Sequence, residues 1–449
     1  MIYQFIKLVV ALSLRIFFKR FVVNKNYDLP TSGPLIIVGN HPNTLMDPYI
    51  LATLFKQKVG FLGNASLFVN KAVSTFFRYF QVIPVYRPQD VGPGIKPDNS
   101  KTFAACYKHL ENGKAIMIFP EGTSFGELKL RKIKTGTARI ALGVQEKNDF
   151  RLDLKIIPIG LYYSSPSRFR SKVYVNVGEM ITTQNWKEPF ADDDVFAVQE
   201  LTKQIKTSLE QLVIHTRDQE QEDLFHKIKR IYKSRLLDTY NLEKDRQEEF
   251  RLTQEISKAI QYFQAIFPVK FQKLKNKIEE CDQLMSQLKT SSKISGFSLN
   301  LPPILRVVLN VLYIIVGFPI YIYGYLHNFL PFRIPRWAAQ KITKEVEYHA
   351  PISMTIGIFL FPICYGAYAF TFSNYFFNHW LIIFLYIISL PLSGYYALHY
   401  YHLLKRSKEF LNDYLTSGSK KEMMEQLKSL KKEITQELDN ASVEYLNRL

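Results

Sequence analysis

The chain has 449 residues, 47% of them hydrophobic, and its 58 Lys and Arg outnumber its 40 Asp and Glu, giving a net charge of +18. The apolar content excludes a disordered chain. The three widely spaced cysteines, Cys106, Cys281 and Cys364, exclude a disulfide scaffold. The charge indicates anionic partners, such as phosphate-bearing substrates, an anionic lipid surface or nucleic acid.

The first 23 residues predict an amphipathic helix in a membrane interface. Lys7 and Arg15 interrupt the apolar run, which makes it a poor membrane-spanning helix. On a helical wheel one stripe contains Gln4, Lys7, Ala11, Arg15 and Lys19. The remaining surface of the helix is mostly Ile, Leu, Phe and Val, which is the pattern of an amphipathic interfacial helix. The alternative is a helix packed on the protein's own core. We assign residues 1–29 to this interface segment.

Residues 30–190 predict an α/β domain. Short β-rich runs recur along it, with helix-length stretches between several of them: 34–39, 59–63, 81–86, 115–119, 155–161 and 172–178. Such alternation indicates crossover connections and a central, mostly buried sheet flanked by helices. No glycine-rich nucleotide-binding fingerprint follows these runs.

Residues 191–300 predict an amphipathic helical region. Apolar residues recur at helical spacing in two runs, which begin at Val198 and Leu252. Acidic and basic residues are mixed throughout, which favours a solvated face over a nucleic-acid surface, so we expect no nucleic-acid partner. The same helical spacing in residues 405–449 predicts a soluble C-terminal helix.

Residues 301–404 contain three stretches without Asp, Glu, Lys or Arg: Val307–Leu330, Pro351–Phe377 and Asn378–Leu404. Each is long enough to cross a hydrocarbon core of about 30 Å. Basic residues between the first two stretches and after the third predict that the second and third form a hairpin with both ends in the cytoplasm.

The first stretch has basic residues on both sides, so the positive-inside rule places both of its ends in the cytoplasm. A single membrane crossing cannot satisfy that rule at both ends. Pro319 near its centre, with Gly317 and Gly324, would allow the chain to enter the membrane and turn back. We therefore favour a re-entrant segment over a crossing that violates the charge rule.

Two polar blocks directly follow predicted strands, at the edge where open α/β sheets bind ligands. In the first, NHPNTLMDP, His41 and Asp47 can form a dyad in which the carboxylate orients the imidazole as a general base. A metal site is the alternative, but the pair lacks a clear third ligand, so we expect no metal.

The second block, FPEGTSF, contains Glu121, Gly122, Thr123 and Ser124, and its hydroxyls and backbone N–H groups could hold a phosphate. An ordinary β-turn is the alternative. Two basic residues lie near these motifs in the sequence. Arg87 directly follows the predicted strand QVIPVY, and Lys134 follows the second block. Arginine binds phosphate with two parallel hydrogen bonds.

Taken together, the motifs NHPNTLMD, VIPVYR, FPEGTS and IIPIG resemble the glycerophospholipid acyltransferase family, the membrane enzymes related to bacterial 1-acyl-glycerol-3-phosphate acyltransferase. In that family an NH-x4-D block, an Arg-ending strand, an FPEG[TS] block and a [VI]P[VI] strand occur in this order. The resemblance covers residues 30–190. Here five residues separate His41 from Asp47, as in the fungal-type glycerol-3-phosphate/dihydroxyacetone-phosphate acyltransferases, whose C-terminal membrane segments this chain also shares.

The resemblance implies that His41 is the general base and Asp47 its orienting partner. It also implies an acceptor-phosphate site built from the remaining motif residues: Arg87, Glu121, Gly122, Thr123, Ser124 and Lys134. No covalent acyl-enzyme and no cofactor are required, because an acyl-CoA or acyl carrier protein thioester is the co-substrate.

The implied activity is transfer of a fatty acyl group to glycerol 3-phosphate or dihydroxyacetone phosphate in phospholipid synthesis. A 1-acyl-glycerol-3-phosphate (lysophosphatidate) acyltransferase is the alternative, and a non-catalytic membrane scaffold a further one. A metal-dependent phosphohydrolase would need a carboxylate cluster that the sequence lacks. We expect an integral membrane protein with its catalytic domain on the cytoplasmic face of a bacterial inner membrane or of the endoplasmic reticulum. Donor, chain length and oligomeric state stay open.

Overall fold

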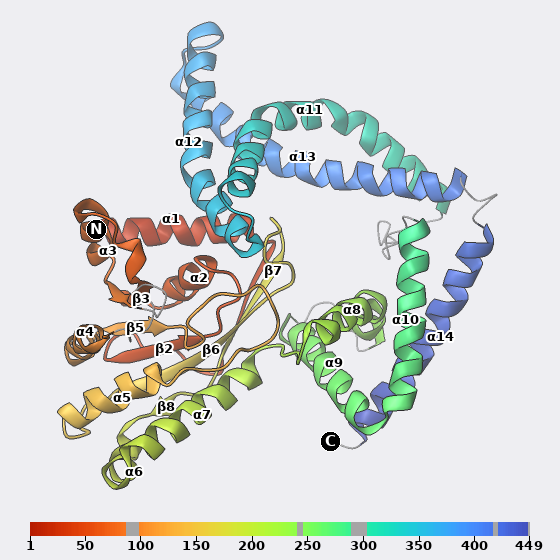
Figure 1. Cartoon of the computed structure of the whole chain (residues 1–449). Helices are drawn as coiled ribbons and strands as arrows, with labels where there is room; N and C mark the ends of the chain where they lie inside the picture. The colour runs from red at the N-terminus through yellow and green to blue at the C-terminus, as the bar shows by residue number, and fades with distance from the viewer. Residues whose placement is uncertain (87–97, 240–245, 289–302, 416–420, 448–449) are drawn as a thin grey trace. The chain divides into compact units, whose positions relative to one another are not determined.

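A computed structural model describes residues 1–86, 98–239, 246–288, 303–415 and 421–447 (Figure 1). The chain divides into two compact units. Unit 1 contains residues 1–219 together with two later segments, 245–254 and 343–351. Unit 2 contains the rest of the chain, including the three long apolar helices.

Unit 1 is built around one sheet in the order β1-β7-β6-β2-β5-β3-β4, with β8 also paired to β6. The strands are β1 (Arg20–Asn24), β2 (Leu35–Gly39), β3 (Val59–Asn64), β4 (Val82–Val85), β5 (Ala115–Ile118), β6 (Lys155–Tyr163), β7 (Lys172–Val177) and β8 (Ile181–Thr182). Strands β6, β2, β5, β3 and β4 run parallel, whereas β7 runs antiparallel to β6 and parallel to β1. The carboxyl ends of five strands therefore meet at one edge.

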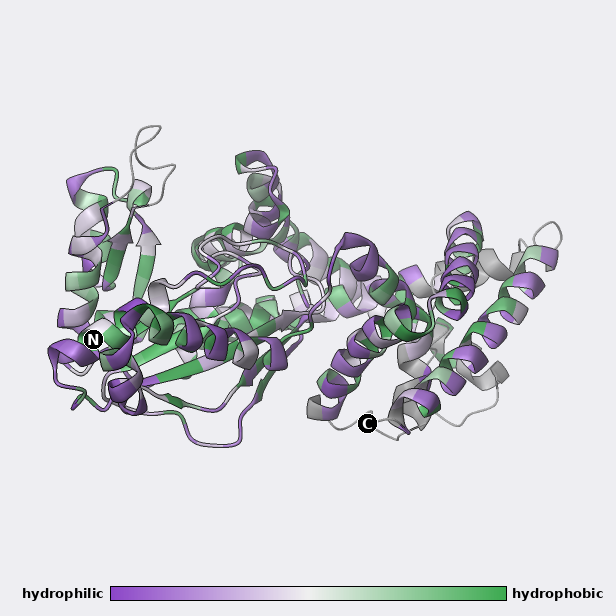
Figure 2. Ribbon diagram, turned by 60° about the horizontal axis from the view of Figure 1, so that its bottom comes forward, coloured by the Kyte–Doolittle hydropathy of each residue, from purple (hydrophilic) through white to green (hydrophobic). Residues whose placement is uncertain are grey.

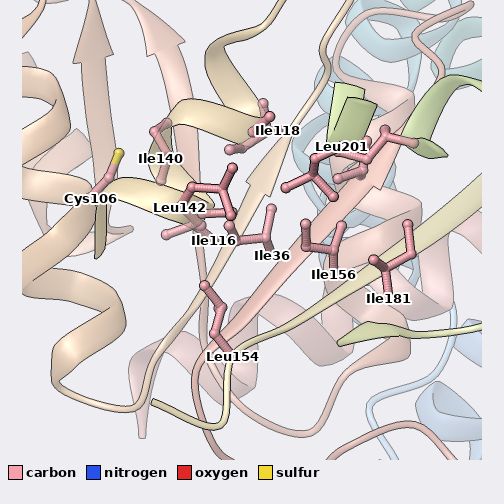
Figure 3. Close-up of a cluster of buried hydrophobic side chains, with 14 of the residues drawn as sticks. Ile36, Cys106, Ile116, Ile118, Ile140, Leu142, Leu154, Ile156, Ile181 and Leu201 are labelled. Atoms are coloured by element: carbon pink, nitrogen blue, oxygen red, sulfur yellow. The ribbon is translucent and has the colours of Figure 1, made fainter. Parts of the chain in front are cut away.

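The helices of unit 1 cover both faces of this sheet (Figure 1). They are α1 (Ile2–Phe17), α2 (Met46–Leu54), α3 (Lys71–Tyr79), α4 (Ser100–Glu111), α5 (Gly136–Lys147), α6 (Lys187–Asp192) and α7 (Asp194–Leu212). Helices α4, α5 and α7 enclose a cluster of buried side chains that includes Ile36, Ile116 and Ile156 of the central strands (Figure 3). Helices α1 and α2 pack against each other and lie on the other face. These central strands are accordingly buried except at Lys155, the first residue of β6, and hydrophobic (Figure 2), as expected for a parallel sheet covered on both sides.

The six predicted strands are confirmed, but the predicted helix over residues 1–23 is wrong beyond Phe17. Phe18 is extended, with φ −91° and ψ 129°, and Arg20–Asn24 continues as β1 beside β7. The segment RFVVN is rich in β-branched and aromatic residues, which favour a strand that can bury one face. The α/β domain therefore begins before residue 30, at β1.

Pro158 lies where strand β6 changes its partner. Strand β8 pairs with Lys155 and Ile156, and β7 pairs with residues 159–163. Proline has no N–H to donate, so it fits this junction, while its carbonyl accepts from Gly178 N at 2.9 Å.

Two boundaries predicted for the helical regions also shift. Helix α7, capped by Asp193, belongs to unit 1, because Leu201, Ile205 and Leu209 pack into the sheet core. Helix α13 continues to Leu415, past the predicted boundary at residue 404. The helical spacing of apolar residues in 191–300 is the same in α7 and in the helices of unit 2. This spacing therefore could not show where one unit ends and the other begins.

Two later segments complete unit 1. Glu249 of α9 (Arg246–Ile266) is buried and pairs with Arg20 of β1 at 3.2 Å and with Lys172 of β7. Thr44, in the loop after β2, donates a hydrogen bond from Oγ1 to the Glu347 carbonyl at 3.1 Å. Residues 343–351 connect two long apolar helices, so the loop after β2 is bonded to the segment between them.

Unit 2 is helical: α8 (Gln219–Thr239), most of α9, α10 (Pro268–Leu288), α11 (Pro303–Ile342), α12 (His349–Tyr375), α13 (Trp380–Leu415) and α14 (Lys421–Leu446). Helices α10 and α14 pack together, with Lys277 of α10 paired to Glu433 and Glu437 of α14 at 3.2 and 2.7 Å. Three helical stretches are long and apolar enough to cross a membrane: Val311–Ile342, Val346–Tyr375 and Trp380–Lys405.

The predicted turn near Pro319 is absent, because α11 is one continuous helix through Pro319, Pro331 and Pro335. It packs along α13 (Figure 1), and a Cβ on Gly324 would lie 2.1 Å from the Ser393 carbonyl oxygen. Asn328 of α11 donates to the Leu390 carbonyl at 3.0 Å and accepts from the Tyr365 hydroxyl at 2.6 Å. Neighbouring helices and polar side chains of this kind let a membrane helix tolerate proline. The membrane sides of its two ends stay a prediction.

Candidate active site

His41 and Asp47 meet at the carboxyl edge of the sheet. His41 follows β2, and Asp47 lies in the first turn of α2. The Nδ1 atom of His41 lies 2.8 Å from Oδ2 of Asp47, whose side chain is 0% exposed. The five intervening residues include Thr44 with φ +40°, a left-handed conformation that is uncommon for a β-branched residue. The longer spacing therefore still brings the pair into hydrogen-bond contact.

Asp47 has two further donors that fix its carboxylate. The backbone N–H of Asn43 donates to Oδ2 at 2.7 Å, and the hydroxyl of Tyr163 donates to Oδ1 at 2.5 Å. Burial, together with the neighbouring Asp47 carboxylate, raises the pKa of Tyr163 well above its usual value, so the hydroxyl stays protonated. Tyr163 was not among the predicted site residues: it lies just past the predicted strand 155–161, and only the pairing of β6 with β2 brings its hydroxyl to Asp47.

Asn40 holds the end of β6 beside the loop that carries His41 and Asp47. Its side-chain Nδ2 donates to the Leu161 carbonyl at 3.0 Å, and its Oδ1 accepts from the Leu161 N–H at 2.7 Å. The amide thus continues the β2–β6 ladder beyond the last β2 residue. This link places Tyr163, two residues further along β6, next to Asp47.

The imidazole of His41 is fixed on its face as well as at Nδ1. The ring of Phe119, at the end of β5, stacks on it with centroids 4.0 Å apart and planes 10° from parallel. A neutral histidine that donates from Nδ1 to a carboxylate keeps its lone pair on Nε2. Since the His41 side chain is partly exposed, Nε2 is the atom available to a substrate.

The Glu121 carboxylate links two loops by hydrogen bonds. One carboxylate oxygen accepts from the His41 N–H at 3.0 Å and the other from the Arg131 N–H at 3.1 Å. Burial raises the pKa of Glu121, and these two hydrogen bonds act in the opposite direction. Both oxygens therefore have backbone donors, which positions Glu121 to hold the His41 loop.

Ser124 joins the two predicted motifs directly, because its Oγ accepts from the Thr44 N–H at 2.9 Å. The neighbouring Phe125 N–H donates to the His41 carbonyl at 3.1 Å. Thr123 lies in the same turn and is partly exposed. The two polar blocks, 80 residues apart in sequence, thus form one surface at the sheet edge.

Gly122 and Lys134 adjoin on the exposed side of this surface. Gly122 has φ +78°, and a Cβ built on it would lie 2.4 Å from Lys134 Nζ. Lys134 is exposed, forms no ion pair within the described part of the chain, and stands just before the N-terminus of α5. A lysine and a helix N-terminus together favour an anion. Arg87, the other predicted cation, lies outside the described residues.

A pocket opens beside His41 and Glu121. Its apolar lining comes from three residues of the loop after β5, from Leu161 of β6, and from the two residues after α7: Phe125, Leu128, Leu130, Leu161, Val213 and Ile214. Chemically, the arrangement offers a fixed base, a neighbouring cation and an apolar wall within one site. Among the residues that the structure covers, no three His, Cys, Asp or Glu side chains are grouped to hold a metal ion.

Comparison with known proteins gives matches centred on this unit. The acyltransferase family matches residues 20–162. Glycerol-3-phosphate O-acyltransferase 1 of Saccharomyces cerevisiae is 32% identical over 142 residues, which are 30% of this chain and 18% of that protein. Glycerol-3-phosphate O-acyltransferase 2 of the same yeast is 35% identical over 115 residues, which are 25% of this chain and 15% of that protein. The chain therefore matches less than a fifth of the length of these relatives.

Among solved structures, the 1-acyl-sn-glycerophosphate (LPA) acyltransferase of Thermotoga maritima is similar with a TM-score of 0.33 and 18% sequence identity. The likeness covers 46% of this chain and 78% of that one, and at this score it carries no argument about the site.

Proposed function

We propose that this chain, whose residues 20–162 match the acyltransferase family, moves a fatty acyl group from an acyl thioester to a hydroxyl of glycerol 3-phosphate or dihydroxyacetone phosphate. The observation that carries the proposal is the His41–Asp47 pair at the sheet edge, held by Tyr163 and Asn43. The names of the two yeast relatives give glycerol 3-phosphate as acceptor, which supports this acceptor over lysophosphatidate.

In the proposed reaction His41 acts as the general base. An alcohol is a weak nucleophile, so Nε2 takes the hydroxyl proton as the acceptor oxygen attacks the thioester carbonyl carbon. Asp47 stabilises the imidazolium that forms, through its contact with Nδ1. The carbon–sulfur bond then breaks, and His41 returns the proton to the departing thiolate. The products are an ester and a free thiol, and no acyl-enzyme forms.

Lys134, Arg87 and the turn at Gly122 and Thr123 are proposed to bind the acceptor phosphate. The exposed ammonium of Lys134 supports this role, because it lies against Gly122 and has an open approach. Fixing the phosphate presents the neighbouring hydroxyl to His41, which converts a bimolecular encounter into an oriented one. Glu121 and Ser124 take a positioning role here, since their oxygens already accept backbone N–H groups.

We place the catalytic unit on the cytoplasmic side of the membrane, where soluble thioesters and glycerophosphates occur. Arg333, Arg336, Lys341 and Lys344 precede the segment that bonds to Thr44, and such a cluster favours the cytoplasm. The donor is acyl-CoA or acyl carrier protein, with no other cofactor.

The test is an acceptor panel with the purified full-length protein in vesicles. Glycerol 3-phosphate, dihydroxyacetone phosphate and lysophosphatidate are each supplied with acyl-CoA or acyl carrier protein, and the ester product is quantified. Preference for either small phosphate supports the proposal, and preference for lysophosphatidate supports the alternative acceptor. If the wild type is no faster than the His41→Ala variant with every pair, a scaffold role replaces an enzymatic one.

A further inference from the structure

Helix α1 leaves one of its two apolar faces in solvent. Its inner face buries Tyr3, Leu14 and Phe17, and the helix packs against α2. The outer face exposes Ile2, Phe5, Leu8, Leu12 and Ile16, with Phe5 and Leu8 each 67% exposed. The structure also corrects the predicted cationic stripe, because Nζ of Lys7 donates to the Phe55 carbonyl and so points into the protein.

A second element, residues 64–80, exposes apolar groups in the same part of unit 1. It contains a short 3-10 helix, Ala65–Leu67, and α3, none of whose residues is buried. Val69 is 79% exposed and Phe76 58%. Asn70 caps α3 through a hydrogen bond from the Val73 N–H at 2.9 Å, so the helix is well formed without a buried face.

The two elements adjoin at the start of α1 (Figure 1). The rings of Tyr3 and Phe80 lie 6.2 Å apart. The ammonium of Lys58 lies over the Tyr3 ring at 5.2 Å and over the Tyr79 ring at 5.7 Å. The N-terminal end of α1 therefore adjoins the C-terminal end of residues 64–80 in unit 1.

The charge of these two parts of the sequence is one-sided. Residues 1–27 contain five Lys and Arg, residues 48–89 contain another five, and neither range contains Asp or Glu. Together they hold more than half of the net charge of +18. Lys71 and Arg78 are exposed on α3 beside its apolar side chains. Apolar side chains next to exposed cations fit an anionic lipid surface, where insertion and electrostatic attraction act together.

We propose that α1 and residues 64–80 form one docking face that inserts into the anionic leaflet of a phospholipid bilayer. Residues 64–80 are the new part, because no helical or charge pattern in the sequence marked them as a membrane contact. A bilayer is the occupant because the chain carries three helices long and apolar enough to cross one. A single interfacial helix can roll about its axis, whereas two adjoining contacts fix the tilt of the domain. The proposal is independent of the acyltransferase activity.

The test uses full-length protein in vesicles, with an environment-sensitive fluorophore on Val69→Cys. Cys364→Ala removes the one natural cysteine that is not buried, since Cys106 and Cys281 are. The matched control carries the label on Arg151→Cys, an exposed position outside both segments. Vesicles contain phosphatidylcholine with or without phosphatidylglycerol, and a fraction of the lipids carries a doxyl quencher.

We expect strong quenching at position 69 and little at position 151, with the difference larger in anionic vesicles. Lys71→Glu and Arg78→Glu, at exposed sites on α3, should remove most of the anionic gain, as should salt that shortens the Debye length to a few ångströms. Equal quenching at positions 69 and 151 would overturn the proposal. So would a position 69 label that is shielded from water but not quenched by lipid, because a protein partner or second copy would then cover the face.

Discussion

Asp47 and Lys134 stand at the two ends of the site and are held in opposite ways. The Asp47 carboxylate is fully buried and contacts His41, Asn43 and Tyr163. Lys134 is exposed, and its ammonium lies against Gly122.

This contrast indicates different roles for Asp47 and Lys134. Groups that develop charge during a reaction act best when their partners are fixed beforehand, because no reorganisation is then needed. A cationic side chain that binds a soluble phosphate must be accessible from solvent, and its conformation can become fixed when the ligand binds. We therefore expect changes at the buried end to lower kcat and changes at the exposed end to raise the acceptor KM.

The largest effect is expected from His41→Ala. Loss of a general base lowers the rate by about 10²–10⁴-fold. Product formation is measured at saturating acceptor, and circular dichroism and membrane fractionation check that the variant is folded and inserted. Turnover close to wild type in a folded variant would remove His41 from the mechanism.

Tyr163→Phe tests whether the buried end is fixed in advance. The substitution leaves an oxygen of a buried carboxylate without its donor, which costs about 1–3 kcal/mol. We expect a lower thermal midpoint and a kcat reduced about tenfold, with the acceptor KM unchanged.

Tyr162→Phe is the matched control for this prediction. Tyr162 is also buried, but successive strand residues point to opposite faces, so it faces away from Asp47. Equal kcat losses in both variants would show that the effect comes from packing rather than from the Asp47 hydrogen bond.

Lys134→Ala tests the exposed end. A hydrogen bond to a charged group contributes about 1.5–3 kcal/mol, and exposure favours the lower figure, which corresponds to about a tenfold rise in the KM for glycerol 3-phosphate. The KM for the thioester should not change. Lys132→Ala, at another exposed lysine of the same loop, is the control. A rise confined to the thioester KM would move Lys134 out of the acceptor site.

Ser124→Ala should have the smallest effect. Its hydroxyl accepts from the Thr44 N–H, and one such hydrogen bond contributes about 0.5–1.5 kcal/mol. We expect a small drop in the thermal midpoint and an unchanged acceptor KM. A clear rise in that KM would instead assign Ser124 to phosphate binding, as its motif suggests.

The sequence predicted those features that depend on local pattern. Alternating β-rich runs located six strands, and polar blocks after two of them located the site. Strand β1 was not predicted because it follows the apolar helix α1 almost directly. Hydrophobicity alone therefore does not show where the helix ends and the strand begins. Tyr163 escaped because its role depends on strand order: only the β2–β6 pairing brings its hydroxyl to Asp47. Glu121 was found, but its backbone partners could not be read from spacing.

The hydrogen bond from Thr44 to Glu347 has a consequence for how the protein is made. Domains generally fold as units while the chain emerges from the ribosome. Here the loop that carries His41 is complete by residue 47, yet its partner carbonyl emerges only after the whole of α11 has been translated. Glu249, which pairs with β1 and β7, also arrives long after those strands. These contacts of unit 1 therefore form only after the first apolar helix has been translated.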